Sequence, residues 1–140
     1  MDREILFRGR TIKTRFGGGK WIEGFFVMSC AGRAEMEPAI ITGTEKGCFM
    51  TEFIDPATVG QYTGLCDKNG VKIFEGDKLY CEARLDKAEM YVVFEKGQFR
   101  MVLCDKFKEY ETGRGYYDIN SFQKTVVGNI HDNPELLREE

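Results

Sequence analysis

The chain has 140 residues, of which 42% are hydrophobic and 13% aromatic, and its formal net charge is only −3. Disorder would need low hydrophobicity and a large net charge, so the composition predicts a folded protein, and the length predicts a single domain. A subdivision near Asp55, into residues 1–54 and 55–140, stays open, although no linker composition marks it.

The first half of the chain is predicted to form short strands that are separated by glycine-rich or polar turns. Strand-forming residues run over positions 4–8 and 20–29, with a turn at positions 16–19, where three glycines permit positive φ angles. A strand pair over residues 39–42 and 48–54 follows a polar loop.

Residues 61–65 and 71–74 are predicted to pair across a tight turn at Asn69-Gly70. Asn-Gly is a strong hairpin signal, because both residues tolerate the positive φ angles that a two-residue turn requires. The turn is followed by a Gly-Asp corner at Gly76 and Asp77, from which the next strand starts.

The second half continues as strands over residues 78–84, 89–95 and 98–104. The charged stretch 106–118 is interpreted as a loop or mobile hairpin, and residues 122–130 as the last strand. Many short strands at frequent intervals predict an all-β, mostly antiparallel protein. We expect a rolled or bifurcated sheet or a small SH3-like barrel.

A short C-terminal helix is expected after the last strand. Asn133 is a preferred N-cap residue and Pro134 suits the first helical position.

The cysteines and the chain's hydropathy bear on compartment and cofactors. Five cysteines lie far apart without a Cys-x-x-Cys pair, and there is one histidine, His131, so we expect neither a metal site nor another cofactor. No apolar run approaches the roughly 20 residues of a membrane helix, and no apolar signal region follows Met1. These features predict a reduced, cytoplasmic protein.

A basic segment near the start of the chain is the candidate nucleic-acid contact. Five basic residues and no acidic residue lie in it: Arg8, Arg10, Lys13, Arg15 and Lys20. Basic side chains on a small β-barrel could contact phosphates; the alternative is a solvated strand face plus a turn. The isoelectric point near 5.4 argues against strong sequence-independent binding of nucleic acid.

Few residues are candidates for chemistry. Glu75 and Asp77 could act as an acid–base pair or bind Mg²⁺, but the preferred interpretation is that Asp77 binds backbone amides of the corner while Glu75 is exposed. Tyr62 could stack on a ligand; a place in the core with its hydroxyl at the rim is preferred. Because no nucleophile or phosphate-loop motif is present, we expect no enzymatic activity.

Residues near the end of the charged stretch are typical of a protein contact, since tyrosine and arginine are enriched in interface hot spots. The candidates are Tyr110, Arg114, Tyr116 and Tyr117. Binding of another protein, or of a second copy of this chain, is therefore the preferred function, and nucleic-acid binding is the alternative. No membrane partner is expected.

Three stretches of sequence carry a further pattern: residues 3–8 with 21–24, residues 59–77, and residues 127–137. Its positions are Gly60, Gln61, Tyr62, Thr63, Gly64, Asp67, Asn69, Gly70, Glu75, Gly76, Asp77, Gly128 and Asn129. On these residues the chain resembles the YopX family of phage and prophage proteins. The resemblance implies a phage or prophage origin, a mostly β fold and a homo-oligomer, and it brings no catalytic residue.

Overall fold

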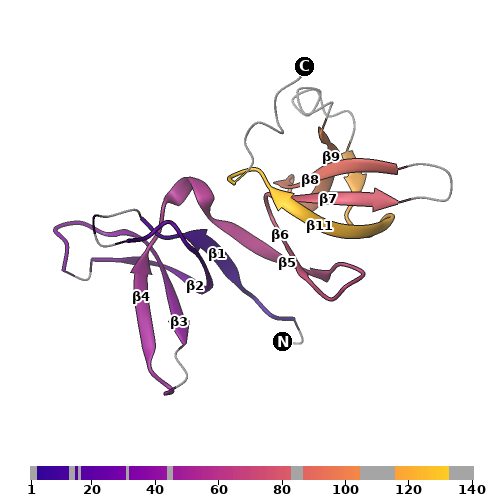
Figure 1. Cartoon of the computed structure of the whole chain (residues 1–140). Helices are drawn as coiled ribbons and strands as arrows, with labels where there is room; N and C mark the ends of the chain where they lie inside the picture. The colour runs from indigo at the N-terminus through magenta and orange to yellow at the C-terminus, as the bar shows by residue number, and fades with distance from the viewer. Residues whose placement is uncertain are drawn as a thin grey trace. The chain divides into compact units, whose positions relative to one another are not determined.

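The strands of this protein form two antiparallel sheets (Figure 1), and the only helix in the described part of the chain is the short 3-10 helix η1 (Pro56–Thr58). The computed structural model describes residues 3–12, 15, 17–30, 32–43, 46–82, 87–104 and 116–132. The all-β, antiparallel class is therefore confirmed. The closed SH3-like barrel is not found: over these residues both sheets are open, with β4 and β6 at the ends of one and β10 and β11 at the ends of the other.

The chain divides into two compact units, Met1–Tyr62 and Thr63–Glu140, called unit 1 and unit 2 below. The expectation of a single domain stays a prediction. No helix in the described residues is long and apolar enough to cross a membrane.

Unit 1 is built on successive antiparallel hairpins. Its strands are β1 (Phe7–Arg10), β2 (Trp21–Ser29), β3 (Glu37–Gly43) and β4 (Phe49–Phe53). The first half of β2 pairs with β1 and the second half with β3. β5 (Gly60–Cys66) begins beside β1 and continues into unit 2.

Glycines let the strands of unit 1 approach closely. A Cβ atom on Gly24 would overlap the carbonyl oxygen of Ile41, and one on Gly9 would lie 2.8 Å from Cδ1 of Ile54. Ile40 and Ile54 are accordingly almost completely buried, at 0% and 1% exposure. The core of unit 1 therefore depends on the absence of side chains at two strand positions.

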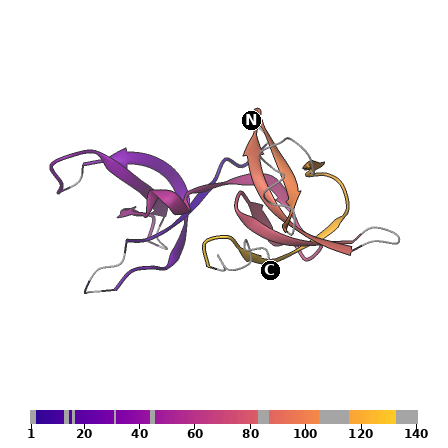
Figure 2. The same ribbon diagram turned by 90° about the horizontal axis from the view of Figure 1, so that it is seen from above.

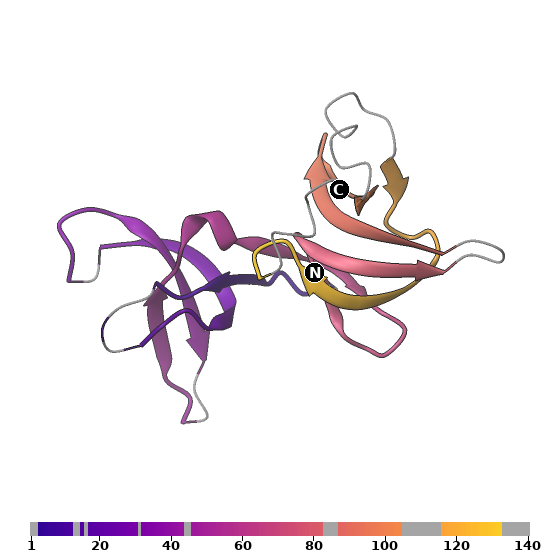
Figure 3. The same cartoon turned by 45° about the horizontal axis from the view of Figure 1, so that its top comes forward.

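Unit 2 contains the second sheet, in the order β10-β9-β8-β7-β11. The strands of that sheet are β7 (Asp77–Glu82), β8 (Lys87–Glu95), β9 (Gln98–Leu103), β10 (Tyr116–Asp118) and β11 (Gln123–Asn129). Unit 2 also contains β6 (Lys72–Phe74), which belongs to the first sheet. β8 and β9 form a long hairpin, drawn in salmon and orange in Figure 2. β11, drawn in yellow, lies along β7 (Figure 3).

The core of unit 2 is apolar and rich in sulfur. Its buried cluster consists of Ile73, Leu79, Cys81, Met90, Val92 and Met101. Strands β7, β8 and β9 supply all but one of these residues, because alternate side chains of neighbouring strands point to the same face of the sheet.

Three predictions about the elements need comment. The first strand, β1, begins at Phe7 and so overlaps the predicted segment 4–8 by only two residues. The sequence predicts a loop or mobile hairpin over residues 106–118; Tyr116 to Asp118 form a strand that pairs with Val102 to Arg100 of β9, and residues 106–115 lie outside the described residues. The expected C-terminal helix lies outside the described residues.

Candidate functional site

Asp67 is a buried carboxylate at the turn between β5 and β6, and its exposure is 8%. Its Oδ1 atom accepts hydrogen bonds from the backbone amides of Asn69 (2.8 Å) and Val71 (2.9 Å). Its Oδ2 atom accepts one from the amide of Val126 in β11, at 3.0 Å. Asp67 therefore shapes its own turn and fastens that turn to a strand 59 residues away.

The hydrogen bonds of Asp67 also set its protonation state. Burial acts to raise the pKa of this carboxyl, but the amides of Val126, Val71 and Asn69, helped by the charge of Lys68, outweigh burial and lower the pKa below its ordinary value. A carboxylate held ionised by backbone donors is a poor general acid at neutral pH.

Asp77 has a similar role at the Gly-Asp corner. It is 1% exposed, and its Oδ2 atom accepts a hydrogen bond from the amide of Phe74 at 2.8 Å. Gly76 takes a φ angle of +90°, donates to the carbonyl of Val92 and accepts from the amide of Ile130. The amide-binding interpretation of Asp77 is confirmed, whereas Glu75 is half-buried rather than exposed.

Asn129 closes the turn after β11. Its Oδ1 atom accepts from the amides of His131 (2.9 Å) and Asp132 (2.8 Å), and its Nδ2 atom donates to the carboxylate of Asp132 (2.9 Å). At the β5–β6 hairpin, Thr63 donates to the carbonyl of Ile73 at 2.8 Å. These side chains bind the backbone at turns and hairpins.

Four more pattern positions are also explained by the fold. Gly64 and Gly70 have φ angles of +88° and +83°, Gly128 lies at a register shift between β11 and β7, and Tyr62 is in the core at 8% exposure, as preferred above. Within the described residues, no group of three or more His, Cys, Asp or Glu side chains is placed to hold a metal ion.

Two residues of the basic segment, Arg8 and Arg10, lie against Trp21. The guanidinium groups of Arg8 and Arg10 lie 4.9 and 5.1 Å from the centre of the indole ring, within the range of cation–π attraction. Lys20 is exposed and lies 3.9 Å from Glu52, and Arg15 is exposed. Lys13 lies outside the described residues.

The tyrosine cluster is only partly described, since Tyr110 and Arg114 lie outside the described residues. Tyr116 and Tyr117 belong to β10 at the end of the second sheet. The ring of Tyr117 packs edge-on against Phe122, with centroids 5.8 Å apart. Tyr117 therefore packs against its own unit while 36% of its surface remains exposed.

A set of exposed apolar side chains stands out in unit 1, on both faces of the sheet formed by β2, β3 and β4, and we call it the apolar surface. It consists of Phe25, Met28, Phe49 and Met50, which are 59%, 47%, 72% and 52% exposed. The sequence contained a signal for it: in Phe25-Phe26 and Phe49-Met50, neighbouring strand residues are both apolar. Because successive side chains point to opposite faces, one apolar side chain of each pair lies on each face of the sheet.

Comparisons with known proteins agree with this architecture. The family model described as YopX protein matches residues 26–138. The crystal structure of protein EF1440 from Enterococcus faecalis is 23% identical in sequence, with 98% of this chain and 100% of that chain covered and a TM-score of 0.53. At this identity the likeness concerns the fold alone. The comparison with curated proteins gave no match.

Proposed function

Because this chain belongs to the YopX family, and because the family's pattern residues here hold turns together, we propose that it is a non-enzymatic module that binds protein. The partner we propose is a second copy of the chain, joined through the apolar surface of unit 1. A cytoplasmic accessory role in a phage or prophage is part of the same proposal. The observation that carries it is the exposure of large apolar side chains on β2 and β4.

The carboxylates support the non-enzymatic part of the proposal. Asp67 and Asp77 are the buried acids of the family pattern, and backbone amides bind both of them. Charge-assisted bonds of this kind are stronger than neutral ones and fix the carboxylate in place. Either carboxylate could take part in a reaction only after losing the hydrogen bonds that hold its turn.

Edge strand β4 supports the choice of a second copy. It ends the order of the first sheet and contains neither proline nor lysine, two residues that commonly protect sheet edges. The amide of Ile54 donates to Pro38 of β3, and the carbonyl of Phe53 accepts from Ile12 on the other side. Since backbone groups alternate along a strand, those of Phe49 and Thr51 point outward, toward a pairing strand.

Two β4 strands related by a twofold axis can pair antiparallel, because each offers the same outward groups. Such pairing would extend the sheet and cover Phe49 and its neighbours. It needs no rearrangement of the β3–β4 ladder, whose hydrogen bonds lie on the opposite edge of β4.

The test is sedimentation velocity of the purified chain and its variants. We expect a dimer for the wild type and monomers for Phe49→Ser and Thr51→Pro. The proline removes an outward amide, so the β3–β4 ladder should survive, which circular dichroism checks. Val71→Ser, at a 49% exposed site in unit 2, is the matched control and should remain dimeric. A monomeric wild type, or a dimer that tolerates both changes, would overturn self-association.

The stacked arginines on Trp21 favour a second candidate function, the binding of single-stranded nucleic acid. Arginine and aromatic side chains together form platforms on which bases stack. Trp21 is the only tryptophan, so its fluorescence reports the site directly. We expect the Trp21 fluorescence to change when an oligonucleotide is added, and we expect salt to weaken this change. The double variant Arg8→Glu with Arg10→Glu should lose the change, whereas Arg33→Glu should keep it. Unchanged fluorescence would remove this candidate.

A further inference from the structure

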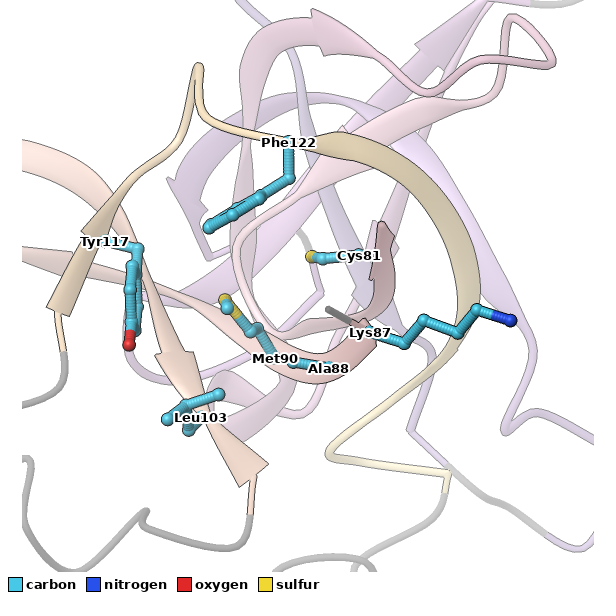
Figure 4. Close-up of a pocket in the computed structure, with 7 residues that line it drawn as sticks. All are labelled: Cys81, Lys87, Ala88, Met90, Leu103, Tyr117 and Phe122. Carbon is cyan, nitrogen blue, oxygen red and sulfur yellow. The ribbon is translucent and has the colours of Figure 1, made fainter. Parts of the chain in front are cut away.

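Unit 2 contains a cavity of about 310 Å³ at one end of its core. Figure 4 shows the rings of Phe122 and Tyr117 facing Cys81, Met90 and Leu103, while the ammonium group of Lys87 extends away from the two rings. The walls are therefore aromatic, aliphatic and sulfur-containing. Pockets for small molecules begin at about this size and usually have such walls.

The backbone of Phe122 is strained at the edge of the cavity. Its φ angle is +67°, in the left-handed region that favours glycine. A side chain in this region costs on the order of 1–3 kcal/mol, and such strain gathers at ligand sites. The conformation aims the Phe122 ring at Tyr117, so the two rings stand edge to face across 5.8 Å.

Lys124 holds this strained turn in place. Its Nζ atom donates to the carbonyls of Ser121 and Phe122, both at 2.9 Å, and the amide of Ser121 donates to the carbonyl of Asp118. The strained conformation is thus fixed by side-chain and backbone bonds together. These hydrogen bonds hold the cavity wall in addition to the contact between the rings of Phe122 and Tyr117.

The groups near the cavity favour an uncharged occupant. Burial raises the pKa of the Cys81 thiol to about 11, although the charge of Lys124 opposes the shift, so the thiol is neutral at physiological pH. The ammonium group of Lys124 is bound to two carbonyls. The ammonium group of Lys87, which also lines the cavity, extends away from the two rings (Figure 4), so a charged ligand beside the rings would give up its hydration without a partner there.

We propose that this cavity binds an uncharged aromatic molecule of about the size of two fused rings. A dry cavity of about 150 Å³ accommodates benzene, and this one is about twice as large. Phe122 and Tyr117 offer edge-to-face contacts to an aromatic ring, and Met90 offers a polarizable sulfur. This site is independent of the apolar surface of unit 1.

The test uses 2-naphthol as the probe and isothermal titration calorimetry of the full chain. We expect saturable binding at a single site, which Ala88→Phe abolishes because the new ring fills the cavity. Val71→Phe places the same ring on an exposed residue just before β6 and should bind like the wild type. The anion 2-naphthalenesulfonate should not bind. Absence of saturable naphthol binding, or equal binding of the anion, would overturn the proposal.

Methyl NMR of the wild type keeps the test decisive if Ala88→Phe does not fold. Naphthol should shift the methyl signals of Ala88, Met90 and Leu103, which line the cavity. Shifts confined to Met28 and Met50 would instead place the probe on the apolar surface of unit 1 and would contradict the inference.

Discussion

The two units hold their strands and turns together in different ways. Unit 2 fixes its turns with buried polar side chains: Asp67, Asp77 and Asn129 are 8%, 1% and 9% exposed and bind backbone amides. Unit 1 brings its strands together by omitting side chains at Gly9 and Gly24.

The units also differ in what they leave exposed. The two most exposed large apolar residues in the described chain, Phe49 and Phe25, both belong to unit 1. Unit 2 also exposes Val127, Phe94 and Val71, at 53%, 50% and 49%, but none of them is as exposed as Phe25 or Phe49. The comparison indicates that buried hydrogen bonds hold the turns of unit 2 in place. Unit 1 exposes the apolar side chains whose burial would contribute most to the free energy of binding a partner.

The change expected to have the largest effect is Asp67→Ala in unit 2. It leaves the amides of Asn69, Val71 and Val126 without their acceptor, which should lower the free energy of unfolding by at least about 3 kcal/mol. Urea unfolding should expose the buried Cys81 thiol earlier, measured by mass spectrometry of its labelled peptide, since Cys30, Cys48 and Cys66 are exposed in the folded protein. Trp21 fluorescence, which reports unit 1, should keep its midpoint. A common shift of both probes would instead show one cooperative domain.

Gly24→Ala is the corresponding change in unit 1. The new Cβ atom would overlap the carbonyl oxygen of Ile41, and overpacking of this kind costs about 1–3 kcal/mol. We expect the Trp21 transition to move to lower urea while the reaction of Cys81 is unaffected. Gly43→Ala is the matched control, because a Cβ atom there meets no atom within 4 Å. Equal effects of the two alanines would contradict the close-approach argument.

Acid should weaken unit 2 through Asp67. The pKa of this carboxyl is lowered in the folded protein from an ordinary value of 3.8. A lowered pKa adds stability above the unfolded-state value, and that stability is lost as the pH falls through the folded value. The midpoint of urea unfolding, followed by circular dichroism, should therefore fall in the wild type as the pH drops below about 3.8. Asp67→Asn, which cannot ionise, should show a smaller drop; an identical pH profile would contradict the assignment.

Strain at Phe122 predicts a smaller effect. Both Phe122→Ala and Phe122→Gly remove the ring, but only glycine relieves the left-handed backbone. Phe122→Gly should therefore be more stable than Phe122→Ala by about 1 kcal/mol, measured by thermal unfolding. Gln123→Ala and Gln123→Gly, at a residue of β11, are the controls. There the alanine variant should be the more stable of the two, because glycine weakens a strand. Equal stability of the two Phe122 variants would argue against strain.

The smallest effect is expected for Lys20→Ala. The lysine is 68% exposed and lies 3.9 Å from Glu52. Exposed pairs of this kind contribute less than about 1 kcal/mol, so the Trp21 unfolding midpoint should barely move. A large loss of stability would mean that the basic segment helps to hold unit 1 together.

The elements that the sequence predicted well are those with local causes. The hairpin at Asn69-Gly70 is present, but only Gly70 takes the positive φ angle expected of both residues, and Asp67 closes the turn. The pairing of β3 with β4 follows from two apolar runs close together. β10 was not predicted, because three residues after a charged, glycine-containing stretch carry no periodic signal.

The candidate site was harder to predict for a physical reason. Sequence identifies Asp67 as a turn residue, but nothing local shows that its second oxygen reaches Val126. Likewise, strand alternation indicates that Phe49 and Met50 face opposite sides without showing that both sides are open. Long-range pairing and exposure depend on the whole fold.

The bond from Asp67 to Val126 has a consequence for the order of events during synthesis. The pairing partners of β1 are available once Gln61 has been made, whereas one oxygen of Asp67 must wait for a strand 59 residues further along. Contacts of large sequence separation form late and slow folding. On the ribosome, unit 1 can therefore be complete while the sheet of unit 2 still lacks its final strand.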